Sequence, residues 1–164
     1  MGQSPLSERL ADAQALVYGP LLSWARQSPL HTDVLGHSAH PALTDVTLGC
    51  WLGASILDAA GGSGSRRGAT TLVGVGLLAS VPTALAGAGD WAGMVGTERR
   101  IGAVHALGTD AATLLLLGSL VARARGRHGS GARLAAAGNA VMAGAGLLGG
   151  HLALSRGTAD RTSG

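Results

Sequence analysis

The chain has 164 residues, of which 46% are hydrophobic and only 13% are charged. A soluble domain carries about 25% charged residues, so this composition predicts a protein that lies in lipid. All twelve basic residues are arginines. Because they flank apolar runs, we interpret them as membrane anchors and expect no nucleic-acid partner. The one cysteine, Cys50, excludes an intramolecular disulfide and CxxC-type zinc or iron–sulfur ligation.

Residues 1–39 are expected to form an amphipathic segment on the membrane surface. Apolar side chains recur there at three- and four-residue spacing, with charged residues between them, and Gly19-Pro20 interrupts the pattern. The apolar series is Leu6, Leu10, Ala13, Val17, Leu21 and Trp24. This period is typical of an amphipathic helix. The segment is too polar to cross a bilayer, so we expect it to lie in the interface.

Four apolar segments follow, at about residues 41–60, 69–89, 101–122 and 133–154. Each is close to the 20 or so residues that cross a hydrocarbon core of roughly 30 Å. Short linkers force neighbouring helices to run antiparallel, and abundant Gly and Ala let backbones approach closely in lipid. The sequence therefore predicts an all-α membrane protein, a four-transmembrane-helix up-down bundle over residues 40–155, with a flexible tail at 156–164.

Arginine placement predicts how the bundle lies in the membrane. The linkers after the first and third segments contain no Asp or Glu, and they hold Arg66, Arg67, Arg123, Arg125 and Arg127. The arginines of the other side are spread over two tails and one loop. Because the positive-inside rule counts charges in short loops, we expect the linkers to face the cytoplasm and both termini to lie outside.

Most polar residues of the apolar region gather at the predicted outer face. The start of the first span and the end of the second contribute His37, His40, Asp45 and Asp90. His105 lies near the start of the third span, and His151 near the end of the fourth. At 1.5 Å per residue these two lie at a similar depth, roughly 7–8 Å below the flanking arginines. Ionisable residues inside a span usually mark a functional site, so the matched depth predicts one near this face.

A neutral imidazole can bind haem iron, zinc or copper. We expect His105 and His151 to be the axial ligands of a b-type haem, with His40 as the substitute, although Pro41 disfavours an ordinary helix through His40. The metal alternative is a bare zinc or copper ion held by His37, His40, His105 and His151. Three carboxylates could fix the imidazole tautomers by hydrogen bonding: Asp45, Asp90 and Asp110. A third interpretation stays open, in which each histidine only hydrogen-bonds a neighbouring helix. We expect no catalytic residue.

A short internal similarity links the first and third spans. "HPALTD", His40 to Asp45, resembles "HALGTD", His105 to Asp110: each has a histidine followed by Thr and Asp four and five residues later. Both stretches open a span at the same predicted face. This pattern predicts a duplicated helix pair, in which the third and fourth spans repeat the first and second.

The motifs "GHSAHPALTDVTLG", "GAVHALG" and "GGHLALSRG" resemble those of DUF2231, a family of bacterial four-helix membrane domains of unknown function. The resemblance covers about residues 31–157. It implies a multi-pass domain of the bacterial inner membrane, found beside or fused to Rieske [2Fe–2S] domains, and therefore a redox neighbourhood. Ser38 stands where the family usually has Pro, and Asp45 where other branches often carry His.

These observations give two main functional hypotheses. In the first, the chain is an electron-transfer module that holds b-type haem near the outer face. In the second, it is a cofactor-free membrane anchor or assembly partner of a Rieske-type protein, a cytochrome or another redox protein, and docks through residues 1–39 and the "DWAGMVGTERR" loop. A histidine-ligated divalent metal site is the further alternative. We expect an electron-transfer or anchoring subunit, not an enzyme, with the lipid bilayer as the constant partner.

Overall fold

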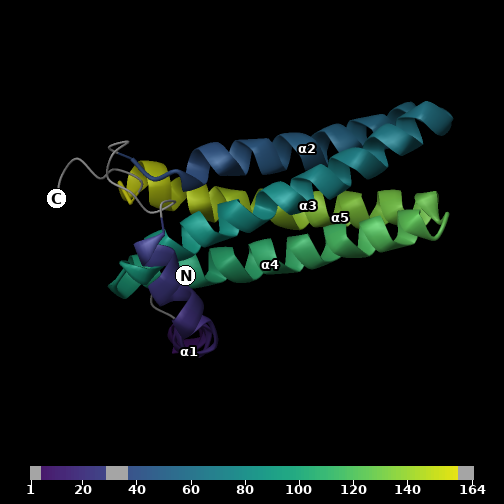
Figure 1. Ribbon diagram of the computed structural model, residues 1–164. Coiled ribbons are helices and arrows are strands. Elements are labelled where there is room, and N and C mark those ends of the chain that lie inside the picture. The colour runs from purple at the N-terminus through teal and green to yellow at the C-terminus, as the bar shows by residue number, and fades with distance from the viewer. Residues whose placement is uncertain (1–4, 29–36, 159–164) are drawn as a thin grey trace.

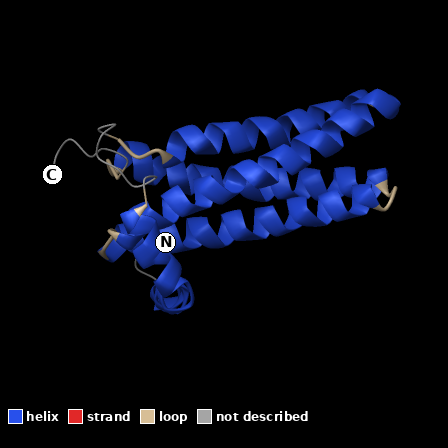
Figure 2. Cartoon of the chain, in the orientation of Figure 1, coloured by secondary structure: helices blue, strands red, loops and turns tan. Residues whose placement is uncertain are grey.

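A computed structural model describes residues 5–28 and 37–158 of the chain. Over these residues the fold is all-helical and contains no β-strand (Figures 1 and 2). The elements are α1 (Pro5–Gln27), α2 (His40–Ala60), α3 (Gly62–Ala92), α4 (Gly96–Ala124), α5 (His128–Gly150) and the π-helical turn η1 (His151–Ser155).

Helices α2 to α5 form an antiparallel bundle built from two hairpins, α2–α3 and α4–α5 (Figure 1). The helices within a hairpin contact each other far more extensively than the two hairpins do. Each hairpin reverses at a glycine in the left-handed region, Gly61 at φ 72° and Gly126 at φ 72°, a conformation that other residues rarely adopt. We call this end of the bundle the far end, and the end with α1 the α1 end.

The helices extend beyond the predicted spans. The glycine- and arginine-rich stretch after α2, which we expected to be a linker, forms the first turns of α3, so only Gly61 separates the two helices. Helix α1 likewise continues through Gly19-Pro20, where the sequence predicted an interruption. A proline removes only one backbone hydrogen bond from a helix, and Pro20 lies at an exposed position.

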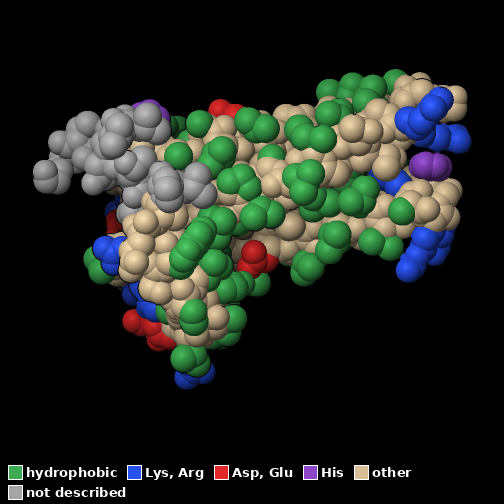
Figure 3. Space-filling view, in the orientation of Figure 1, with side chains coloured by type: hydrophobic (Ala, Val, Ile, Leu, Met, Phe, Trp, Pro, Cys, Tyr) green, Lys and Arg blue, Asp and Glu red, His purple; other side chains and the backbone are tan. Residues whose placement is uncertain are grey.

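Three helical segments of the described chain are long and apolar enough to cross a membrane: α3, α4, and α5 continued by η1. Helix α2 has 21 residues, enough to cross a membrane, but its mean hydropathy is lower than that of these three segments. It carries two acidic residues, Asp45 and Asp58, which lower its hydropathy. On the face that Figure 3 shows, the length of the bundle carries mainly apolar side chains and backbone, and basic side chains lie at its two ends.

Small residues allow the bundle core to pack closely. Trp51 and Leu116 are the largest fully buried apolar side chains, and each faces a glycine of its own hairpin. A Cβ at Gly76 would overlap the Trp51 indole, and a Cβ at Gly138 would overlap the Leu116 side chain. These glycines therefore serve packing, as expected when helices associate in lipid.

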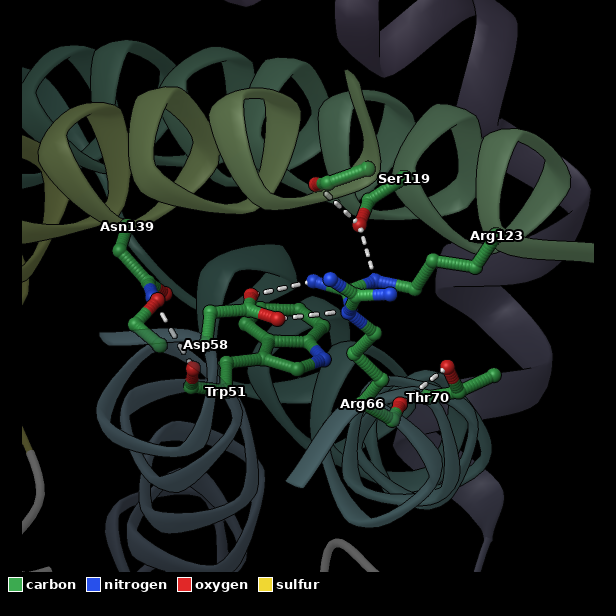
Figure 4. Close-up of polar contacts among 9 residues, drawn as sticks. Trp51, Asp58, Arg66, Thr70, Ser119, Arg123 and Asn139 are labelled. Carbon is green, nitrogen blue, oxygen red and sulfur yellow. Dashed lines mark hydrogen bonds and ion pairs between the residues drawn. The ribbon is translucent and has the colours of Figure 1, made fainter. Parts of the chain in front are cut away.

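A buried ion pair joins the two hairpins at the far end (Figure 4). The Arg123 guanidinium binds both carboxylate oxygens of Asp58, with Nη1 2.9 Å from Oδ1. Its Nε also donates to Ser119, whose hydroxyl donates to the Gly131 carbonyl. The Arg123 side chain is 0% exposed, so this network connects α2 to α4 without help from water.

Helix α1 packs across the other end, against α3 and α4. It turns a face of small and polar residues to the bundle: Ser7, Ala11, Gln14 and Ala25. Leu10 and Leu22 are partly buried beside them, whereas the other large apolar side chains are exposed, namely Leu6, Leu16, Val17, Leu21 and Trp24. An ion pair between Arg99 and Asp12, at 2.8 Å, also holds α1 in place.

Candidate functional site

His40 and His105 lie beside each other between the two hairpins, toward the α1 end, with their rings in an edge-type, T-shaped contact. Their ring centroids are 6.2 Å apart and the ring planes are nearly perpendicular, at 86°. His40 is the first residue of α2, whereas His105 lies well inside α4. Each hairpin therefore contributes one imidazole to a shared site.

Each ring is oriented by a backbone carbonyl of the partner helix in its own hairpin. His40 Nδ1 lies 2.8 Å from the Thr83 carbonyl oxygen, and His105 Nδ1 lies 2.8 Å from the Ala145 carbonyl oxygen. A carbonyl can only accept a hydrogen bond, so Nδ1 carries the hydrogen in both rings. In a neutral imidazole this leaves a lone pair on Nε2. A histidine that binds a metal through Nε2 commonly has this tautomer, with its Nδ1–H donated to a carbonyl or carboxylate.

Glycines make room for both rings. A Cβ at Gly87 would lie 2.8 Å from His40 Cε1, and a Cβ at Gly149 would lie 2.9 Å from His105 Cε1. Each glycine lies four residues after the residue whose carbonyl accepts the hydrogen bond from the ring, Thr83 or Ala145. The two histidines are thus held in the same way by the two hairpins.

This equivalence extends along the whole bundle and supports the predicted duplication. Positions in α4 correspond to positions 65 residues earlier in α2, and positions in α5 to positions 62 residues earlier in α3. The corresponding pairs include His40/His105, Trp51/Leu116, Asp58/Arg123, Gly76/Gly138 and Gly87/Gly149. The histidine site therefore lies between two copies of one helical hairpin, and the far-end ion pair joins corresponding positions of those copies.

Two cavities border the histidine pair, and both rings line each of them. The outer cavity, toward the α1 end, has a volume of about 130 Å³. Its lining includes Asp90, Trp91, Met94, Gly102 and Leu152. The inner cavity has a volume of about 90 Å³ and reaches down the bundle to Trp51 and Met142. Both linings are mainly apolar, with a few hydroxyl and carboxyl groups.

The ring nitrogens that form hydrogen bonds to the Thr83 and Ala145 carbonyls do not use the three predicted carboxylates as partners. Asp90 accepts a hydrogen bond from the Ser38 hydroxyl, and Asp45 is exposed on α2. Asp110 accepts a hydrogen bond from the Tyr18 hydroxyl of α1, at 2.8 Å. This bond, with partial burial and the carboxylate charge, raises the pKa of Tyr18 above its usual value near 10.

The other two predicted ligands lie apart from the paired rings. His151 is exposed in η1 and lines neither cavity. His37 is exposed as well, with Nδ1 3.1 Å from the Ser38 carbonyl oxygen. Within residues 5–28 and 37–158, no three His, Cys, Asp or Glu side chains lie close enough together to hold a metal ion. The structure thus brings together His40 and His105, which are two of the four histidines proposed from the sequence.

Sequence reasoning missed the groups that orient the rings. The carbonyls of Thr83 and Ala145 carry no side-chain signature, so only the fold can assign them. Gly87 and Gly149 had a weak signal, because both lie the same distance after a glycine that accommodates a core side chain. That signal becomes readable only once the two hairpins are aligned.

No protein-family model, curated protein or solved structure matches this chain. The fold and the site define a helical-bundle protein with three membrane-length helices and a paired-histidine centre between duplicated hairpins.

Proposed function

We propose that the chain is a membrane-embedded electron-transfer module that holds a b-type haem between its hairpins, with His40 and His105 as the axial ligands. The separation of the two rings carries this proposal. An imidazole nitrogen binds zinc, and metal ions of similar size, at about 2.0–2.1 Å, so two rings on opposite sides of one ion have centroids about 6–6.5 Å apart. The observed separation is 6.2 Å.

Three further features fit this group. Both Nε2 atoms are available, because both Nδ1 atoms are hydrogen-bonded to carbonyls. Two cavities border the ring pair at the interface between the hairpins, which contact each other less than the helices within a hairpin do. Small residues such as Ala84 and Gly146 line these cavities and leave space for a macrocycle.

A bound haem would supply one-electron redox chemistry. The chain's own part is to hold both ligands and to tune them. A hydrogen bond from Nδ1 to a carbonyl fixes the tautomer and makes Nε2 a stronger donor. The apolar lining keeps water away from the ligand nitrogens, and burial of this kind is one of the factors that set a redox potential.

We also infer that α2 is the fourth membrane span. It runs antiparallel beside α3, and Arg123 compensates the charge of Asp58. His105 and Arg125 are 20 residues apart in the sequence, a helical rise of about 30 Å, which is roughly the thickness of the hydrocarbon core. If Arg125 marks the inner boundary, the histidine pair lies at the outer one.

The placement of α1 fits the interfacial position expected from the sequence. Its exposed apolar side chains would enter lipid beside the bundle, while the basic far end would face the cytoplasm. Both termini then lie outside a bacterial inner membrane, on the side of the haem. The resemblance to DUF2231 favours a Rieske protein or a cytochrome as the redox partner at that side.

Optical and elemental analysis of the purified full-length protein, expressed with haem supplied, tests this function. We expect a Soret band with one haem per chain. His40→Ala and His105→Ala should each remove six-coordinate haem, whereas His151→Ala, the matched control, should leave it unchanged.

Each other outcome points to a different hypothesis. Loss of haem in His151→Ala but not in His40→Ala would restore the pairing first expected from the sequence. Stoichiometric zinc or copper without haem would favour the divalent metal site. Protein free of all three would favour the cofactor-free anchor, and either of these last results rejects the haem proposal.

A further inference from the structure

The two histidines of the site differ in how their backbones are held. His105 is the tenth residue of α4, so intrahelical hydrogen bonds fix the backbone on both sides of it. His40 is the first residue of α2. The first four N–H groups of a helix have no partner within the helix, so the backbone at His40 needs an external partner to be equally well fixed.

Ser38 supplies that partner. The His40 N–H donates to the Ser38 hydroxyl oxygen at 3.1 Å, and the Ser38 hydroxyl in turn donates to Asp90 Oδ2. Ser38 is only 2% exposed, which protects both hydrogen bonds from exchange with water. Because Asp90 lies in the last turn of α3, the Ser38–Asp90 pair attaches the start of α2 to the end of α3.

The second hairpin lacks this arrangement. Asp90 follows Gly87 by three residues, and the residue three positions after Gly149 is Leu152, which is buried against the same outer cavity. The carboxylate is thus present only in the copy whose histidine begins a helix. In the copy whose histidine is continuous with a long helix, an apolar side chain takes its place.

We propose that Ser38 and Asp90 are positioning residues for His40, and that they hold its imidazole opposite that of His105. They act on the ring through the backbone of the first turn of α2. The Thr83 carbonyl then selects the tautomer of a ring whose position is already set. The link to haem ligation rests on the proposed function, but the positioning role itself does not.

Nitrogen NMR of the haem-free full chain, labelled with ¹⁵N-histidine, tests the positioning role directly. In Asp90→Leu and in Ser38→Ala, amide exchange at His40 should speed up about fivefold, as expected for the loss of a typical helix N-cap. The His40 imidazole should also lose its single Nδ1–H tautomer. His105 should keep both properties, and it serves as the internal control.

Conservative variants separate positioning from a general loss of structure. Asp90→Asn keeps an oxygen that can accept the Ser38 hydrogen bond, so it should restore wild-type signals at His40. Asp45→Leu, which removes an exposed carboxylate from α2, the helix that His40 begins, should leave the His40 signals unchanged. Equal changes at His40 and His105, or no change at His40 in either Asp90→Leu or Ser38→Ala, would overturn the proposal.

A second readout uses the haem-loaded protein. Asp90→Leu should shift part of the haem from the six-coordinate to the five-coordinate state while His105 keeps it bound, and Asp90→Asn should not. If the wild type binds no haem but Asp90→Leu and Ser38→Ala still change the NMR signals of His40 selectively, the positioning role is supported and the proposed function is rejected. A fully six-coordinate Asp90→Leu protein would reject the positioning role alone.

Discussion

Removal of Arg123 from the far-end ion pair should destabilise the bundle strongly. The Arg123 side chain is 0% exposed and that of Asp58 is 12% exposed, so Arg123→Leu leaves a carboxylate without its cation in a nearly water-free place. Breaking a buried ion pair from one side costs about 3–5 kcal/mol. The variant also deprives the Ser119 hydroxyl of a donor, so we expect a loss within that range.

The double variant Asp58→Leu/Arg123→Leu is the decisive comparison. Replacing both charges by apolar side chains removes the isolated carboxylate, and such replacements are often neutral or stabilising. Most of the stability lost in the single variant should therefore return. Arg125→Leu, at an exposed arginine of the same end, is the matched control and should change stability by no more than about 0.5 kcal/mol.

Reversible unfolding in mixed detergent micelles, followed by circular dichroism, measures these differences. The haem spectrum should stay unchanged in every folded variant, because about 27 Å of helix separates this pair from the histidines. Two results would refute the reasoning: a single variant as mild as Arg125→Leu, or a double variant as unstable as the single one.

Further substitutions test the site and the docking of α1. Gly87→Ala or Gly149→Ala should lower haem content, measured as Soret absorbance per chain, because the new Cβ would lie within 3 Å of an imidazole carbon. Gly144→Ala, whose Cβ would meet open space, is the control and should leave haem content unchanged. Tyr18→Phe should loosen α1 without loss of haem, as limited proteolysis between α1 and α2 would show, and equal cleavage rates in the two proteins would contradict it. Because folding raises the pKa of Tyr18, the hydrogen bond from its hydroxyl to Asp110 stabilises the fold fully below pH about 10, the pKa of tyrosine in the unfolded chain. This contribution is lost as the pH rises through the pKa of Tyr18 in the folded protein. The thermal midpoint of the wild type should therefore fall more steeply than that of Tyr18→Phe above pH 10.

The helical bundle was predictable because long apolar runs separated by short linkers leave few alternatives. The expected spans were shorter than the helices, since hydropathy marks only the lipid-facing part, while helices such as α3 continue through Arg66 and Arg67. The sequence also placed an amphipathic series in α1, but it could not show which face meets the bundle. Small and polar residues took most of that place, with Leu10 and Leu22 partly buried beside them, and the other large apolar side chains remained exposed.

The sequence predicted the level of the candidate histidines along the bundle, but not the direction in which each side chain points from its helix. Counting residues placed His105 and His151 at one level, but the direction of a side chain depends on the phase of its helix. His151 begins a π-helical turn and is exposed. Pro41 was expected to disfavour an ordinary helix through His40, and α2 indeed begins only at His40, because proline is well suited to the first turn of a helix, where its missing N–H has no role.

Electron paramagnetic resonance of the oxidised, haem-loaded full chain tests the central claim most directly, because the ferric spin state reports both axial ligands at once. We predict a single low-spin signal for the wild type and for His151→Ala, and a high-spin signal for His40→Ala. A high-spin wild type, or a His40→Ala protein that remains low-spin, would contradict the assignment of His40 and His105 as the paired ligands.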